Sequence, residues 1–304
     1  VKNGYIKING TPWLKDNTSI AAHERTVGFV FQNAALLPHL SVEQNIAFAR
    51  KRRRSNRLEL YLENLMDIMG LAPLMKQLPH QLSGGEQQRV AIIRALATGP
   101  DILLMDEPLS ALDSKLKHEI LSYLEQIKTQ IDIPILYVTH SIEEVTRLAD
   151  HLVLIEQGQV LASNAIEHVL SDLKFSHFFG QDACVAFEVN VLEKEQEYGL
   201  IRCSFSGGGL WLQDNGESLN QLMRVRINAK DVSVAIAEPH DSSILNRLQG
   251  EIVEFHRQGN FVLVKVAVGD VTILSKLTFK SFEHLDLAIN KRVWLQVKSI
   301  VVAH

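Results

Sequence analysis

The chain has 304 residues, 46% of them hydrophobic and 22% charged, so it can bury a substantial core and form two or three domains. A net charge of −4 gives no electrostatic argument for nucleic acid, and Cys184 and Cys203 are too few for a disulfide framework, which points to a reducing compartment. No apolar run approaches the roughly 18–20 residues of a membrane-spanning helix, so we expect any membrane association to come through a partner.

The first part of the chain alternates short apolar runs with helical segments, as a parallel α/β sheet requires. The run Gly-Phe-Val-Phe-Gln at residues 28–32 reads as a strand that ends in Gln32. Residues 41–81 read mainly as helix, because Ser41 and Gln44 form a capping pattern and apolar residues recur at helical spacing. We expect most of these apolar residues to be core: Leu58, Leu62, Leu65, Met66 and Met69.

Residues 50–54, Arg-Lys-Arg-Arg-Arg, with Arg57 nearby, form the only strong run of charge in the sequence. Such runs are most often a solvated face of a helix or loop, and we prefer that interpretation. The second interpretation is attraction to anionic lipid headgroups, worth at most about 1 kcal/mol per residue. Nucleic-acid binding ranks third, because no interleaved aromatic residues are present to stack on bases.

Residues 82–89, Leu-Ser-Gly-Gly-Glu-Gln-Gln-Arg, predict a turn that opens a helix. The free backbone N–H groups and the positive end of the helix dipole at such a turn suit a phosphate. Gly84 and Gly85 allow a close backbone approach that a Cβ would obstruct. The pattern therefore indicates an anion-binding helix start.

Residues 102–105 read as a short buried strand that ends in two carboxylates, Asp106 and Glu107. Carboxylates at the carboxyl end of such a strand lie where open α/β sheets bind ligands. Asp106 suits a hydrated Mg²⁺, and Glu107 suits orienting or deprotonating an attacking water. An isolated Asp-Glu pair would favour an ordinary acidic strand end, but here the ordered run Pro-Leu-Ser-Ala-Leu-Asp follows at 108–113.

A further short strand at residues 135–138 is followed by Thr139 and His140. A lone histidine or glutamine at a strand end is more often a satisfied polar residue than a functional one. The four elements together, however, resemble an ABC-type ATPase in their chain order. They resemble its Q-loop at Gln32, its signature motif at 82–89, its Walker B strand and D-loop at 102–113, and its switch histidine at His140.

This resemblance implies a P-loop NTPase-like α/β ABC ATPase domain over residues 1–180, with a helical subdomain at about 41–81 where a membrane subunit docks. Within this part, the docking contact fits residues 34–40 best. The implied cofactors are ATP and Mg²⁺, with Asp106 and Gln32 contacting the metal and Glu107, His140 and Gln32 forming the catalytic set. Two copies would face head to tail, each completing the other's ATP site. The nucleotide-binding residues implied by resemblance are Ser83, Gly84, Gly85, Glu86 and Asp113.

One element of that family is missing from the sequence. None of the 17 glycines precedes a lysine, so the Walker A loop Gly-x-x-x-x-Gly-Lys-[Ser/Thr], which holds the β- and γ-phosphates, is absent. Residues 1–10 resemble the strand and turn that follow the helix of this loop in ABC ATPases. We therefore expect an N-terminally truncated sequence that is inactive as it stands. The alternative is a degenerate, non-hydrolysing relative.

After Gly180 the sequence becomes rich in strand patterns. The glycine run at 207–209 reads as a turn, and residues 222–227 alternate apolar and polar side chains. We expect a β-rich connecting segment at 181–241 and a small OB-like barrel at 242–304 that folds separately and associates with itself. Further strands are expected at 251–256, 261–268, 271–276 and 292–302.

Three tail segments, 242–246, 277–281 and 297–300, resemble the Mop or TOBE domain of bacterial molybdate importers. The resemblance suggests an oxyanion site, with molybdate as the candidate ligand, built from hydroxyl, backbone and cationic donors. Leu245 stands where related domains often carry arginine, which removes one fixed cation. A barrel that only dimerises or regulates is therefore an equal alternative. The donors suggested by position are Ser243, Thr278, Ser281, Lys298 and Ser299.

Together the resemblances imply the ATP-hydrolysing subunit of a molybdate importer, peripheral on the cytoplasmic face of the bacterial inner membrane. The expected partners are a second copy, two integral membrane permease subunits and, indirectly, a periplasmic molybdate-binding protein, and no nucleic acid. One alternative is an ATPase for another oxyanion, such as tungstate or sulfate. The other is a non-catalytic oxyanion-binding regulator derived from such an ATPase.

Overall fold

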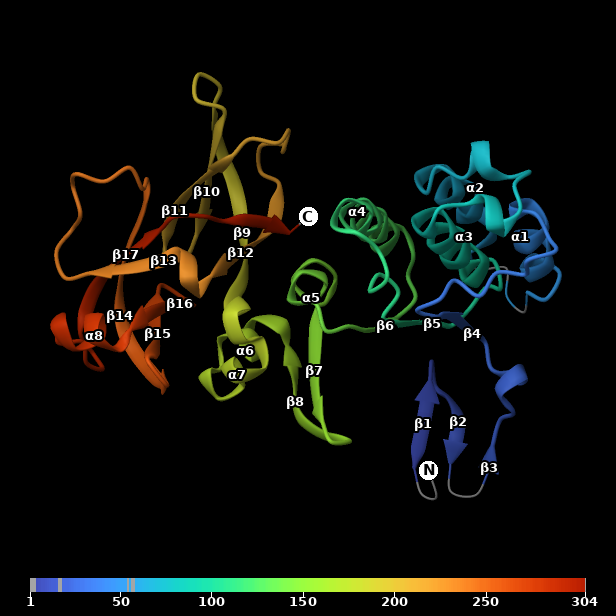
Figure 1. Cartoon of the computed structure of the whole chain (residues 1–304), viewed down its shortest axis with the longest axis horizontal. Helices are drawn as coiled ribbons and strands as arrows, with labels where there is room; N and C mark the ends of the chain where they lie inside the picture. The colour runs from blue at the N-terminus through green and yellow to red at the C-terminus, as the bar shows by residue number, and fades with distance from the viewer. Residues whose placement is uncertain (1–3, 16–17, 54, 56–57, 304) are drawn as a thin grey trace. The chain divides into compact units, whose positions relative to one another are not determined.

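The computed structural model describes residues 4–15, 18–53, 55 and 58–303. The chain divides into two compact units, Val1–Glu144 and Val145–His304, whose elements are labelled in Figure 1. None of the helices in the described ranges is both long and apolar enough to cross a membrane.

The first unit contains a parallel sheet of three strands in the order β4-β5-β6. These strands are β4 (Val27–Val30), β5 (Ile102–Asp106) and β6 (Ile135–Val138), as the sequence predicted. One face of the sheet buries Val30, Leu103 and Met105. Gly28 lets β4 pass close to the neighbouring helix, because a Cβ there would lie only 3.1 Å from the carbonyl oxygen of Ala95.

Helix α3 (Gly84–Leu96) contacts β4 and also packs against α1 (Val42–Arg50), α2 (Glu59–Ile68) and α4 (Ser114–Gln130) (Figure 1). Among its described residues, this unit also contains a separate antiparallel sheet and three 3₁₀ turns, and α5 (Ile142–Leu148) begins at its end. The sheet strands are β1 (Tyr5–Ile8), β2 (Thr11–Lys15) and β3 (Thr18–Ser19). The turns are η1 (Ala22–Glu24), η2 (Ala72–Leu74) and η3 (Pro79–Gln81).

The helical prediction for residues 41–81 is confirmed in two pieces, α1 and α2, followed by the turns η2 and η3. The capping box at Ser41 forms with both of its hydrogen bonds: Ser41 N donates to Gln44 Oε1 (2.9 Å) and Gln44 N donates to Ser41 Oγ (3.2 Å). The apolar residues at helical spacing are buried as expected, namely Leu58, Leu62, Leu65, Met66 and Met69.

The described arginines of the charged run at residues 50–54 contact side chains of the same helical region. Arg50 lies 2.8 Å from Glu63, Arg53 forms an ion pair with Glu59, and the guanidinium of Arg52 lies 3.5 Å from the ring centroid of Phe48. Arg54 and Arg57 lie outside the described residues. These contacts favour the interpretation as a helix surface over lipid or nucleic-acid binding, because the described arginines already have carboxylate or aromatic partners.

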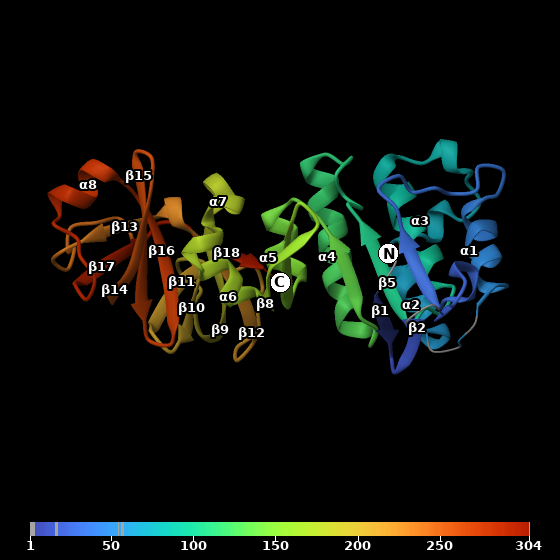
Figure 2. The ribbon, with the colours of Figure 1, turned by 90° about the horizontal axis from the view of Figure 1, so that it is seen from below.

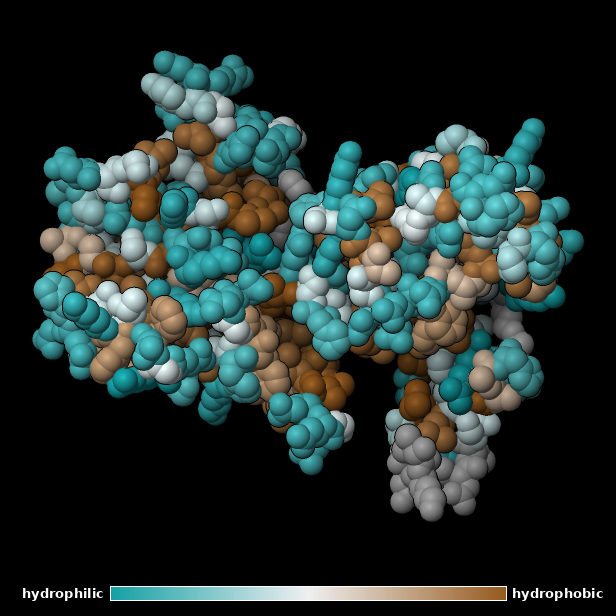
Figure 3. Space-filling model, viewed as in Figure 1, coloured by the Kyte–Doolittle hydropathy of each residue, from teal (hydrophilic) through white to brown (hydrophobic). Residues whose placement is uncertain are grey.

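The second unit begins with the hairpin of β7 (His151–Glu156) and β8 (Gln159–Ala165), whose exposed apolar side chains form a brown patch in Figure 3. Those side chains belong to Val153, Ile155, Val160 and Leu161. Short helices follow: α6 (Ile166–Ser171), η4 (Leu173–Phe175), α7 (Ser176–Phe179) and η5 (Gly180–Asp182).

Two five-stranded antiparallel sheets make up the rest of the unit. The first, in the order β11-β10-β9-β12-β18, comprises β9 (Cys184–Glu195), β10 (Leu200–Phe205), β11 (Gly208–Gln213), β12 (Leu222–Asn228) and β18 (Val301–Ala303). The second, in the order β13-β17-β14-β15-β16, comprises β13 (Val232–Ala235), β14 (Asn246–Gln258), β15 (Phe261–Val268), β16 (Val271–Thr278) and β17 (Arg292–Val297). The short elements η6 (Ala229–Asp231) and α8 (Phe279–His284) complete the unit.

The second sheet curls upon itself. Strands β15 and β16 pair along their whole length and stand side by side in Figure 2. Ser275 Oγ on β16 donates to the carbonyl oxygen of Val232 on β13, 2.6 Å away, so the two ends of the sheet meet. This closure is consistent with the expected OB-like barrel.

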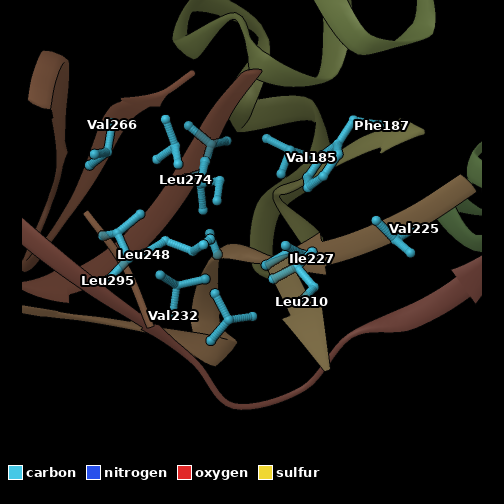
Figure 4. Packing of buried hydrophobic residues seen from close by; sticks show 14 of the residues in the cluster. Val185, Phe187, Leu210, Val225, Ile227, Val232, Leu248, Val266, Leu274 and Leu295 are labelled. Carbon is cyan, nitrogen blue, oxygen red and sulfur yellow. The ribbon is translucent and has the colours of Figure 1, made fainter. Parts of the chain in front are cut away.

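The two sheets exchange strands across the expected boundary at residue 242. Strand β13, from the connecting segment, pairs with β17, and β18, from the tail, pairs with β12. Figure 4 shows the result as one packed cluster that includes Val185, Ile227, Leu248 and Leu295. Residues 181–241 and 242–304 therefore contribute to a single hydrophobic core.

The prediction of one strand over residues 292–302 is wrong at its centre. Strand β17 ends at Val297, residues 298–300 are irregular, and β18 then joins the other sheet. At the break, Lys298 N donates to the carbonyl oxygen of Asp231 (2.8 Å), which turns the chain out of the ladder of β17.

Candidate functional site

The carboxyl ends of β4, β5 and β6 lie at the same edge of the parallel sheet, because the three strands run in the same direction. Gln32 follows β4, Asp106 and Glu107 end β5, and His140 follows β6. The structure therefore brings the predicted strand-end residues to one edge. Asp106, Gln32 and His140 are exposed there, while Glu107 is half-buried.

Glu107 has an unusual backbone conformation that aims its side chain. Its φ is 43°, in the left-handed region that non-glycine residues seldom adopt. Its N–H donates to the carbonyl oxygen of Val138 (3.0 Å), and its own carbonyl accepts from Ser110 N (3.2 Å) and Ser110 Oγ (2.9 Å). These bonds hold a conformation that would otherwise be costly, as is common at functional sites.

The Glu107 side chain meets His140. Oε1 of Glu107 lies 2.8 Å from Nε2 of His140, with 29% of the Glu107 side chain and 87% of the His140 side chain exposed. A carboxylate oriented by an imidazole at the open edge of a sheet is placed to accept a proton from a bound water.

The signature segment begins a helix, as predicted. Ser83 caps α3 in a capping box with Glu86: Ser83 N and Oγ both donate to Glu86 Oε2 (2.7 Å each), and Glu86 N donates to Ser83 Oγ (3.3 Å). The hydrogen bond from the Ser83 hydroxyl is the main reason that the pKa of Glu86 lies below its usual value. The first N–H groups of an α-helix, here those at Gly84 and Gly85, have no carbonyl partner within the helix, which is the arrangement that suits an anion.

Asp113 caps the next helix, α4, by accepting from Lys115 N (3.0 Å) and Leu116 N (3.1 Å). The same turn packs on the signature glycines, since a Cβ on Gly85 would lie 3.2 Å from Leu116 Cδ2. Gly85 therefore has a packing role as well as the predicted ligand role.

The residues that hold the backbone on both sides of Gln32 were not predicted from the sequence. Gln88 Nε2 on α3 donates to the carbonyl oxygen of Phe31 (3.3 Å), and the Arg94 guanidinium donates to those of Ala34 (3.4 Å) and Ala35 (3.0 Å). Burial lowers the pKa of Arg94. Buried Asn45 on α1 donates to the carbonyl oxygen of Leu40 (2.9 Å). The sequence did contain an indication of this role. Asn45, Gln88 and Arg94 are polar residues on faces of α1 and α3 that are otherwise apolar and packed against the core.

The oxygen donors at the strand ends fit Mg²⁺. Among the residues that the structure describes, no group of three or more His, Cys, Asp or Glu side chains is arranged to hold a metal. Mg²⁺ does not need such a group, since it is usually bound by one or two protein oxygens together with water and substrate phosphates. Exposed Asp106 and Gln32 provide such oxygens.

The five residues considered for an oxyanion fall into two groups. Ser243, Lys298 and Ser299 line a cavity of about 670 Å³, together with Trp211, Leu245 and other apolar side chains. Thr278 and Ser281 are not among the lining residues of this cavity. Thr278 instead caps α8, where Ser281 N donates to Thr278 Oγ1 (3.1 Å) and the two hydroxyls lie 2.8 Å apart. Within one chain, the five do not form a single pocket.

Comparison with known proteins extends these observations. The family model for ABC transporters matches residues 1–110, and the model for the TOBE domain matches residues 242–302. The chain is 41% identical over 304 residues to the molybdenum import ATP-binding protein ModC of Methylococcus capsulatus, covering 99% of this chain and 85% of that protein. It is also 41% identical to the protein of the same name from Saccharophagus degradans, covering 99% and 84%, and 39% identical to ModC 1 of Azotobacter vinelandii, covering 98% and 83%.

Proposed function

This chain belongs to the molybdenum import ATP-binding proteins of the ABC transporter family, and we propose that it is the ATP-hydrolysing subunit that energises molybdate import across the bacterial inner membrane. The predicted fold class, an ABC ATPase domain followed by a TOBE domain, is confirmed by the same matches. The observation that supports hydrolysis best is the contact between Glu107 and His140 at the sheet edge.

In this proposal the chain's own residues prepare the attack of a water. Glu107 orients the water and accepts its proton, and His140 holds the Glu107 carboxylate in place and contacts the γ-phosphate. Asp106 and Gln32 would hold Mg²⁺, which when bound with ATP neutralises charge on the phosphates. Ser83, Gly84 and Gly85 would present the start of α3 to a phosphate, with Glu86 fixing Ser83.

We propose that two copies act together, face to face and head to tail. The signature of one copy would complete the ATP site formed by the strand ends of the other, with Asp113 at the seam. Residues 34–40, held by Arg94 and Asn45, would carry the motion to two permease subunits, with a periplasmic molybdate-binding protein supplying the cargo. The subunit would then be peripheral, on the cytoplasmic membrane face.

For the C-terminal domain we propose an oxyanion contact at the cavity that contains Ser243, Lys298 and Ser299. The exposed Lys298 ammonium is the available cation, and the hydroxyls are suitable donors. Thr278 and Ser281 would take part only through a second copy, because they lie outside this cavity. Import of tungstate or sulfate, or a regulatory role without hydrolysis, are the competing functions.

The test uses an extended chain, in which a segment with a Gly-x-x-x-x-Gly-Lys-[Ser/Thr] loop precedes residue 1. Reconstituted with the permease pair and the periplasmic binding protein in vesicles, it should drive ATP-dependent uptake of molybdate and not of sulfate. The extended Glu107→Gln variant serves as the control and should fail. Equal sulfate uptake would contradict the assigned cargo, and uptake by the variant at the parental rate would contradict the assigned chemistry.

A further inference from the structure

An ion pair between a half-buried lysine and a buried glutamate lies beside the switch histidine. Lys117 Nζ on α4 lies 2.6 Å from Glu144 Oε1 on α5, and only 19% and 3% of the two side chains are exposed. The other oxygen of Glu144 accepts from Tyr137 Oη (2.9 Å) and Thr139 Oγ1 (2.6 Å). Burial, with the neighbouring Glu144 charge, raises the pKa of Tyr137, so its hydroxyl stays a donor to this carboxylate.

Each member of the pair holds one of the two residues that flank His140. Glu144 accepts from the hydroxyl of Thr139, and Lys117 donates to Ser141 Oγ (2.8 Å). Thr139 and Ser141 are also joined directly, because Ser141 N donates to Thr139 Oγ1 (3.0 Å). The backbone on both sides of His140 is therefore fixed by one network.

The Lys117–Glu144 pair is also connected to the first turn of α4. Lys117 N donates to the carbonyl oxygen of Asp113 (2.9 Å), the residue that caps the helix. A shift of the first turn of α4 would therefore move the Lys117 ammonium, and with it Ser141 and the His140 backbone. Because Glu144 is buried and Lys117 is half-buried, their attraction is little screened by solvent.

We infer that Lys117 and Glu144 are positioning residues that hold His140 against Glu107 and link it to Asp113. The description of His140 as the γ-phosphate switch rests on the proposed function, whereas the positioning itself does not. Lys117 and Glu144 bond to Ser141 and Thr139, the two neighbours of His140, so their effect would pass through His140.

The chain offers a matched control. His118 Nε2 on α4 lies 3.0 Å from Glu143 Oε1 on α5, so this second pair joins the same two helices one residue away. It differs in being more exposed, with 64% of the His118 side chain and 29% of the Glu143 side chain open to solvent. Glu143→Gln therefore removes one carboxylate charge between the same two helices while Lys117 and Glu144 stay in place.

The experiment records the ring ¹³Cε1–¹H resonance of His140 in the 304-residue chain, without nucleotide, assigned by its loss in His140→Gln. Lys117→Met and Glu144→Gln should move or broaden this resonance by several line widths, and Glu143→Gln should leave it unchanged. Single variants leave a buried charge unpaired and are expected to unfold at lower temperature. The double variant Lys117→Met with Glu144→Gln has no unpaired charge and should regain most of that stability, yet the His140 resonance should stay displaced.

A parental His140 resonance in the folded double variant would overturn the inference, as would an equal displacement in Glu143→Gln. Because no nucleotide is present, these outcomes are independent of ATP hydrolysis. If an extended chain shows the expected changes in the His140 resonance but does not hydrolyse ATP, the result contradicts the proposed function and leaves the positioning role intact.

Discussion

Nε2 of His140 lies 2.8 Å from Oε1 of Glu107, although the two residues come from different strand ends of the parallel sheet. The contact depends on the positive φ of Glu107 and on its backbone hydrogen bond to Val138, which together turn the carboxylate towards the end of β6. Backbone geometry thus sets the contact between the Glu107 carboxylate and the His140 ring, the pair that we propose as base and orienting group.

Replacing Glu107 by glutamine should separate binding from chemistry. The amide keeps the shape of the side chain but cannot accept a proton, so the extended Glu107→Gln chain should bind ATP normally and release phosphate about 10²–10⁴-fold more slowly. Phosphate release and nucleotide binding by fluorescence would be measured together, with Glu143→Gln as the control. Parental turnover in Glu107→Gln would reduce Glu107 to a structural residue.

The 304-residue chain by itself should release no phosphate above the buffer rate, because it contains no Gly-Lys pair to hold the β- and γ-phosphates. The extended chain should hydrolyse ATP in the presence of the permease subunits. Robust Mg²⁺-dependent turnover by the 304-residue chain would contradict the proposed dependence on that loop.

Gly84 and Gly85, the two glycines of the signature segment, should differ in how much an added Cβ changes the free energy of unfolding. A Cβ on Gly84 meets only Leu112 Cδ2 at 3.5 Å, an ordinary contact, whereas one on Gly85 meets Leu116 Cδ2 at 3.2 Å. Gly84→Ala should therefore leave the free energy of unfolding unchanged or raise it by up to about 1 kcal/mol, as alanine favours helix. The same variant of the extended chain should lose ATP-dependent dimerisation, measured by light scattering. Dimerisation at the parental affinity would show that no phosphate approaches Gly84.

The capping box at Ser83 should make stability depend on pH. Since the folded-state pKa of Glu86 is lowered, mainly by the Ser83 hydroxyl, its contribution is present above the unfolded pKa of about 4.3 and is lost as the pH falls through the folded pKa. The difference in unfolding free energy between the parent and Ser83→Ala should therefore shrink on acidification. Ser41→Ala is the matched control, because its capping box uses Gln44, which does not titrate. Parallel pH profiles for the two variants would contradict this assignment.

The exchange of strands between the two β-sheets predicts where the C-terminal domain can be cut. Residues 172–304 contain all the strands of both sheets and should fold alone, whereas residues 242–304 lack β9 and β12, which carry much of the shared core, and should not. Thiol labelling at pH 8 reports on the longer fragment, because burial raises the pKa of Cys184 to about 12 and that of Cys203 to about 11. Both thiols should react slowly until denaturant is added. A cooperative unfolding transition for residues 242–304 would show that the smaller segment suffices.

Local signals in the sequence predicted much of the first unit. The Ser41 capping box, the short strands before Gln32, Asp106 and His140, and the helix start at Ser83 are all encoded within a few residues. Parallel pairing then brings the strand ends together, which is why a set of residues far apart in the chain could be assigned to one edge.

The remaining features depend on contacts between distant segments, which leave no periodic trace. Nothing local in Lys117 or Glu144 indicates that they meet in the interior, since a lysine and a glutamate on helices are usually solvent-facing. The break at Lys298 is set by a hydrogen bond to Asp231, and the motif at Thr278 proved to include a helix cap. In each case, a contact in the folded structure determined which of two conformations compatible with the local sequence was adopted.

The pairing of β13 with β17 also has a consequence for synthesis of the chain. In the part of the chain that the structure describes, the ladder partner of β13 is β17, and three other strands and a helix must be made before β17 appears. While the ribosome translates the intervening residues, the apolar side chains of β13 lack their final partner. Folding of this domain should therefore be late and cooperative during translation, with its nascent form exposed to aggregation or chaperone binding until β17 emerges.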